Sequence, residues 1–219
     1  MIPLLLDPVF FRALVGGMLV LAFFLVARMR LRSMLKMFAW QSLLLALFAA
    51  LTALKMDEPT LYVTAALTAF LKVWFIPWLL VMVAHRTGGS HRLQTYLHPA
   101  IILVCAAMTI LGAFLFTHSL VSSTSPEYVI MAASVSLVLL GLLMLISHKE
   151  MYGQIIGFLL MENGIFIFGI TLTGGMPLLV ELGVFFDVAI GAVLMAALSY
   201  RVQKEHETVD TALLTQLID

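Results

Sequence analysis

The chain has 219 residues, of which 63% are hydrophobic and only 11% are charged, and its 12 basic residues are balanced by 12 acidic ones. This composition lies far from that of soluble globular domains and predicts an integral membrane protein. Without an excess of positive charge, no nucleic-acid partner is expected.

Seven apolar runs are long enough to cross a hydrocarbon core about 30 Å thick. They cover residues 9–27, 38–54, 61–84, 97–116, 129–146, 155–172 and 178–200. Backbone polar groups cannot be left bare in lipid, and none of the runs alternates as a barrel strand does, so each is predicted to be a helix. The predicted fold is an all-α bundle of seven transmembrane helices. It forms one membrane domain over residues 1–219, ending in a short cytoplasmic tail at 201–219, with no room for a soluble catalytic domain.

Basic residues in the connections predict the orientation, because short basic loops stay cytoplasmic. The first, third and fifth connections and the tail carry Arg28, Arg30, Arg32, Lys36, Arg86, Arg92, Lys149, Arg201 and Lys204. The opposite side carries only Arg12 and Lys55. The N-terminus is therefore expected outside and the C-terminus inside. The first run lacks the basic flank and small-residue cleavage site of a secretory signal, so it is expected to remain as a helix.

The second and third runs contain the first polar residues at membrane depth, Gln41 and Lys72. A charged side chain at the centre of a bilayer helix costs roughly 2.5 to 3.5 kcal/mol, so Lys72 requires a reason. Pro77 denies the carbonyl of Val73 its usual helical partner and predicts a kink beside Lys72, where water or an ion could bind. Gln41 is a candidate end of a polar path, with interhelical hydrogen bonding as the alternative.

Cysteine and histidine residues give no sign of a metal or cofactor site in this chain. Cys105 lies inside the fourth run and is interpreted as packing. The histidines are scattered near the ends of the runs and are expected to be interfacial: His85, His91, His98, His118, His148 and His206.

The sixth and seventh runs carry carboxylates at mid-length, namely Glu162, followed by Asn163, and Asp187. The helical rise puts both carboxylates and Lys72 near mid-depth, which predicts a lateral polar layer. Asn163 follows Glu162 directly, so one is expected to face a partner while the other bonds to a neighbouring helix. Glu181 is a second candidate end of the path, or else an interfacial charge.

Buried ionisable groups are candidates for proton transfer, since burial disfavours the charged form of each. Gly183 and Gly191 flank Asp187 by one turn on either side and leave space for a helix or water. The alternative is that Lys72 and one carboxylate form a static ion pair that fixes helix register. One lysine cannot neutralise both Glu162 and Asp187.

Two stretches resemble the component E membrane subunit of hydrogenase-4 and formate hydrogenlyase type complexes: QIIGFLLMENG from Gln154 to Gly164, and VELGVFFDVAIGAVL from Val180 to Leu194. The resemblance extends to Trp40, Gln41, Ser42 and Leu43, and to Lys72 with Pro77.

The last three spans also resemble the K subunit of respiratory complex I and the C subunit of multi-subunit cation/proton antiporters. Asp187 falls on the acidic residue of that subunit's last helix. In the preceding helix, the position at which the complex I subunit has its glutamate is Leu159 in this chain. The acidic residue of this helix is Glu162 instead.

The resemblance implies a non-catalytic, multi-pass subunit of a membrane-bound hydrogenase in the prokaryotic plasma (inner) membrane. Such a subunit passes protons or sodium ions between antiporter-like membrane subunits and the hydrogenase module. Nickel-iron and iron-sulfur centres would belong to partner subunits. The implied relay groups are Glu162, Asp187 and Lys72, supported by Asn163, Gln41, Glu181 and Pro77.

Alternative functions keep the same fold. The chain could serve a cation/proton antiporter that has no hydrogenase, or it could be a membrane scaffold whose buried charges specify assembly. A seven-helix receptor or an unrelated transporter is a further alternative.

Overall fold

A computed structural model describes residues 7–86, 93–121, 125 and 127–173. Within these residues the fold is all-helical, with six helices long and apolar enough to cross a membrane and no strand. This confirms the predicted all-α class. The seventh predicted run (178–200) and the tail (201–219) lie outside the described residues, so the seven-span count and the orientation stay predictions.

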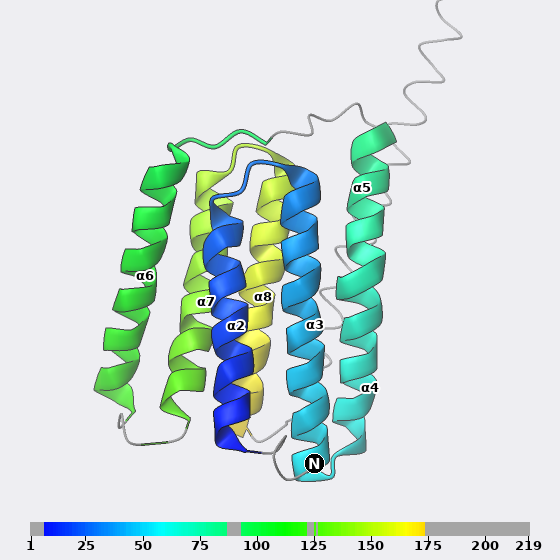
Figure 1. Cartoon of the computed structure of the whole chain (residues 1–219), viewed down its shortest axis with the longest axis vertical. Helices are drawn as coiled ribbons and strands as arrows, with labels where there is room; N and C mark the ends of the chain where they lie inside the picture. The colour runs from blue at the N-terminus through cyan, green and yellow to red at the C-terminus, as the bar shows by residue number, and fades with distance from the viewer. Residues whose placement is uncertain (1–6, 87–92, 122–124, 126, 174–219) are drawn as a thin grey trace, which may run out of the picture.

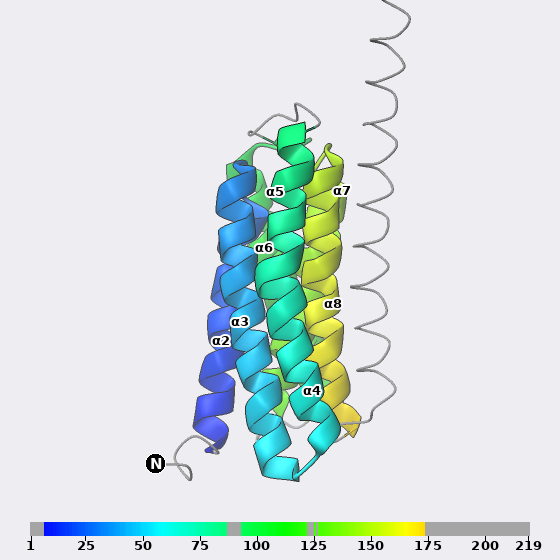
Figure 2. The same cartoon turned by 90° about the vertical axis from the view of Figure 1, so that its right-hand side faces the viewer.

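The six spans follow one another up and down the bundle (Figure 1). The helices are α2 (Pro8–Val26), α3 (Leu31–Met56), α4 (Pro59–Thr68), the π-helix η1 (Ala69–Phe75), α5 (Ile76–Arg86), α6 (Pro99–Leu120), α7 (Tyr128–Ser147) and α8 (Met151–Thr173). Helices α4, η1 and α5 run on from one another as the third span, Pro59–His85. Helices α2, α3, α7 and α8 form the centre, with α6 on one flank and the third span on the other (Figures 1 and 2).

Several helices are longer than their apolar runs predict. Helix α3 begins at Leu31 rather than at residue 38, so Arg32 and Lys36 lie in the helix and not in a connection. Helix α6 continues to Leu120 and α8 begins at Met151. Helical structure continues past the apolar core because long polar side chains can reach the interface while their backbone stays hydrogen-bonded.

The two ends of the bundle differ in charge. We call the end with Arg28, Arg30 and Lys149 the basic end, and the end with Asp57, Glu58 and Glu127 the acidic end. At the acidic end, Asp7 caps α2 by accepting a hydrogen bond from the Val9 amide at 2.8 Å.

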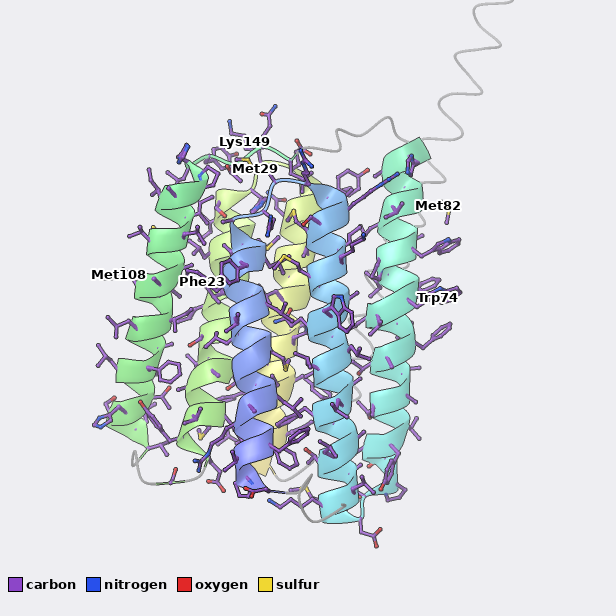
Figure 3. The ribbon with its side chains drawn as sticks, viewed as in Figure 1. Phe23, Met29, Trp74, Met82, Met108 and Lys149 are labelled. Carbon is purple, nitrogen blue, oxygen red and sulfur yellow. The ribbon has the colours of Figure 1, made fainter. Side chains whose placement is uncertain are left out.

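Backbone hydrogen bonds tie three segments together at the basic end. Leu93 N–H donates to the Met29 carbonyl at 2.6 Å, and Tyr96 N–H donates to the Ser147 carbonyl at 2.9 Å. The Lys149 amide donates to the Gln94 carbonyl at 3.0 Å. Figure 3 shows Met29 and Lys149 at this same end of the bundle. The segment before α6 is therefore bonded both to the turn after α2 and to the turn between α7 and α8.

Helices α7 and α8 pack at backbone distance through glycine. A Cβ atom on Gly141 would lie 2.6 Å from the Gly157 carbonyl oxygen, and one on Gly164 would lie 2.7 Å from the Val138 nitrogen. Only glycine allows such an approach, as in other membrane helix pairs. Because Gly164 directly follows Glu162 and Asn163, this contact fixes the part of α8 that carries both polar residues.

The flanks of the bundle present apolar side chains outward. Trp74 and Met82 point away from the bundle on the third span, and Met108 does so on α6 at the opposite side (Figure 3). Trp74 is 60% exposed, and its ring neighbours those of Phe70 and Trp78, with centroids 5.5 and 6.3 Å away. These faces are suited to lipid or to other membrane helices.

Candidate functional site

The third span changes helix type around Lys72. Residues Ala69–Phe75 form a π-helix, and the Ile76 amide donates to the carbonyl of Leu71, five residues back. The sequence predicts a kink at Pro77, and the structure has a seven-residue π-helix that ends at Phe75, shortly before this proline. Single π-turns occur often at functional sites, and an extended one is rare. The proline signals an irregular helix, but its geometry depends on packing.

Lys72 forms an ion pair with α8. Its Nζ lies 3.0 Å from Glu162 Oε1 and donates a hydrogen bond to Asn163 Oδ1, also at 3.0 Å. The exposed fractions are 3% for Lys72, 5% for Glu162 and 0% for Asn163. Lys72 lies at the middle of Pro59–His85, and Glu162 lies midway along α8. The structure thus brings together two predicted relay groups and one predicted supporting residue at mid-depth.

Glu162 and Asn163 have one partner in common, the Lys72 ammonium. Both reach the same ammonium group, because neighbouring helical residues diverge by only about 100° and a lysine side chain is long enough to lie between them. The lysine can only donate, so the amide oxygen of Asn163 must face it and the amide nitrogen must face away.

Helix α3 adds polar side chains near its own middle. Gln41 and Ser42 are fully buried, and Gln41 Nε2 donates to the Met18 carbonyl on α2 at 3.5 Å. Gln41 Oε1 and Ser42 Oγ, together with Asn163 Nδ2 on α8, are among the buried atoms that have no hydrogen-bond partner within the described part of the chain. Buried polar atoms usually have a hydrogen-bond partner, so these atoms are candidate contacts for water. Ser42 was not predicted as a site residue; its signal was its position beside Gln41 in an apolar run.

Two predicted residues cannot be placed. Asp187 and Glu181 lie outside the described residues, so the structure neither joins them to Lys72 nor separates them from it.

His148 lies directly after a membrane span, at the interfacial position that the sequence predicts. It lies at the end of α7 as expected but is fully buried, since the segment before α6 and Gly153 pack against it. Its Nδ1 lies 3.1 Å from the Met144 carbonyl oxygen and its Nε2 3.5 Å from that of Arg28. Burial lowers the pKa of His148, against the opposing effects of the two carbonyl groups and of Glu150.

The remaining candidates form no second site among the placed residues. No group of three or more His, Cys, Asp or Glu residues could hold a metal ion in the described ranges. Cys105 is a half-buried free thiol on α6. A cavity of about 180 Å³ opens at the acidic end, with Phe11, Phe48 and Lys55 in its lining, and it does not reach Lys72.

These features define the class of the protein. It is a polytopic α-helical membrane protein whose described spans enclose a Lys–Glu ion pair at mid-depth.

Curated proteins of matching length are similar to this chain. Hydrogenase-4 component E of Escherichia coli is 29% identical over 207 residues, covering 93% of this chain and 95% of that protein. The same protein of Shigella flexneri matches equally well. An uncharacterized protein of Mycobacterium tuberculosis is 29% identical over 208 residues, covering 93% of this chain and 94% of its own length. No family model and no solved structure matches.

The chain is similar to hydrogenase-4 component E over nearly the whole length of both proteins, which supports the resemblance carried by its motifs. The further likeness of the last spans to subunits of complex I and of antiporters stays a prediction.

Proposed function

We propose that this chain is a non-catalytic membrane subunit of a hydrogenase-like complex and that it contributes a buried relay for protons or sodium ions. The single observation that carries the relay is the buried contact of Lys72 Nζ with Glu162 Oε1 at 3.0 Å. Membership of a complex is supported by the name of the relatives, hydrogenase-4 component E. Antiporter-like membrane subunits are the proposed neighbours in the complex. The redox centres are proposed to lie in the hydrogenase module.

The ion pair has the geometry for proton exchange. At 3.0 Å, the ammonium and the carboxylate are within hydrogen-bond distance. Passing a proton from Nζ to Oε1 converts the ion pair into a neutral pair without changing the net charge of the site. Charge separation is costly in a low dielectric, so a relay that keeps the net charge constant meets a smaller barrier. Asn163 Oδ1 accepts from Nζ in either state, because both the amine and the ammonium carry N–H donors.

The other predicted residues extend the relay in this proposal. Gln41 lies near mid-length of α3 and lines a water path from the side of α2. Asp187 is the next protonatable group and Glu181 an end of the path. Pro77 supports the π-helix that presents Lys72.

Proton uptake by inverted vesicles carrying the assembled complex tests this function. Glu162→Gln keeps the size of the side chain and one acceptor oxygen for Lys72 but cannot exchange a proton with it. We expect the complex to assemble and electron transfer to persist while uptake falls, with the same result for Asp187→Asn. Gln154→Glu, a change in α8 near the basic end, is the matched control for altered charge on this helix. Unchanged uptake in both carboxylate variants refutes the relay.

A scaffold role is the second candidate, and the exposed row of Phe70, Trp74 and Trp78 favours it. Large aromatic groups at membrane depth are suited to contact with another helix. A scaffold would tolerate Glu162→Gln in every assay but lose complex assembly when this row is replaced by alanine. An antiporter subunit without a hydrogenase differs in its partners, which co-purification of the tagged chain identifies.

A further inference from the structure

The oxygen atoms around Lys72 are those that a metal cation would need. Glu162 supplies a carboxylate oxygen and Asn163 an amide oxygen, both at 3.0 Å from the same point and both buried in the bundle. Hard cations prefer these ligand types. In the structure, the point between them is occupied by the Lys72 ammonium.

We propose that the Lys72 ammonium is a tethered cation that replaces a free metal cation between Glu162 and Asn163, so that the site exchanges protons and excludes Na⁺. This inference rests on the proposed relay function. It decides between protons and sodium ions, both of which that function allows. It assigns to Lys72 a role in ion selectivity.

Charge supports the exclusion of sodium. The ammonium neutralises the carboxylate at 3.0 Å, so a Na⁺ ion entering beside it would meet a pair that is already neutral. Two cations at van der Waals distance repel strongly where water is excluded. A proton, by contrast, is already carried by Lys72 and needs no additional ligand.

The orientation of Asn163 supports the same conclusion independently. Its Oδ1 is committed to Lys72, which leaves the Nδ2 donor buried and without a partner in the part of the chain that the structure describes. An N–H donor attracts a water oxygen and repels a metal ion. On α3, Gln41 Oε1 and Ser42 Oγ are also buried and without a partner in the part of the chain that the structure describes.

Binding of ²²Na⁺ to the purified complex in lipid nanodiscs, with choline as the inert cation, tests the proposal without turnover. We compare the wild type with Lys72→Met, which removes the ammonium and keeps the apolar stem. We expect the variant to bind Na⁺ at least about tenfold more tightly than the wild type. The double variant Lys72→Met/Glu162→Gln is the control, in which the gained binding is lost again.

Two results overturn the proposal. The first is that the wild type binds Na⁺ and Glu162→Gln abolishes this binding. The second is that a folded Lys72→Met complex binds Na⁺ no more tightly than the wild type. If Lys72→Met fails to fold, wild-type proton uptake decides, since it is expected to be equal in sodium and choline media; a sodium requirement overturns the proposal. Failure of the relay itself is separate, because unchanged uptake in both Glu162→Gln and Asp187→Asn refutes the relay whatever the Na⁺ binding shows.

Discussion

Gly141 and Gly157 face each other where α7 meets α8, so closely that a Cβ atom on Gly141 would lie 2.6 Å from the carbonyl oxygen of Gly157. The obstructing atom is backbone, which cannot rotate away as a flexible side chain can. Helix α8 carries Glu162 and Asn163, so this contact sets how far both residues reach toward Lys72.

Gly141→Ala is expected to destabilise the protein by about 1 to 3 kcal/mol, the usual cost of overpacking a close contact. Gly112→Ala is the matched control, because nothing lies within 4 Å of a Cβ atom at that position of α6. The control is expected to be neutral or slightly stabilising, since alanine favours helix. Thermal unfolding of the purified protein in detergent measures both changes. Equal effects of the two substitutions would show that the α7–α8 contact is not tight.

Removing one member of the buried ion pair is expected to destabilise the protein more than removing both. Glu162→Leu leaves the Lys72 ammonium buried without its carboxylate, which costs about 3 to 5 kcal/mol for pairs of this kind. The double variant Lys72→Met/Glu162→Leu leaves no buried charge at the pair and should recover most of the loss. A double-mutant cycle of unfolding free energies gives the interaction free energy between Lys72 and Glu162. Additive losses would mean that the two side chains do not interact in the membrane.

His148 is expected to make stability depend on pH. Burial lowers its pKa in the folded protein below the ordinary value of 6.5, so the unfolded chain binds a proton first as the pH falls. The contribution of neutral His148 to the folding stability is fully present above pH 6.5. It is lost as the pH falls from 6.5 toward the lower pKa of His148 in the folded protein. Melting temperatures between about pH 7.5 and 5 should fall for the wild type and less for His148→Gln.

His118→Gln is the control for this experiment, because His118 is an exposed histidine of α6. Its melting curve should follow that of the wild type at each pH. If His148→Gln keeps the full pH dependence, another group is responsible for the loss at low pH.

Cysteine labelling is expected to show the acidic end outside the cell and the basic end in the cytoplasm. In a Cys105→Ser background, we introduce Glu58→Cys and Lys149→Cys at exposed positions of the two ends. An impermeant maleimide should label the first in intact cells and the second only in inverted vesicles, because the basic connections stay cytoplasmic. The reverse pattern would contradict the predicted orientation.

The composition and the apolar runs determined the fold class, because lipid leaves the backbone no partner but its own helix. The same rule made Lys72 and Glu162 visible as site residues, since a charge inside such a run is costly wherever its helix packs. The ends of the apolar runs predicted the helix boundaries less well. Helix α3 begins at Leu31 because water and headgroups accept Arg32 and Lys36 on a helix as readily as on a loop.

The tertiary structure alone decided which groups meet. The sequence shows Glu162 and Asn163 as neighbours on one helix, but only the packing of both η1 and α8 against α3 brings these residues to the Lys72 ammonium. It also buried His148, at the end of α7, beneath the segment before α6. Local sequence fixes the cost of placing a group in lipid, whereas contacts between distant segments fix the partners that offset this cost.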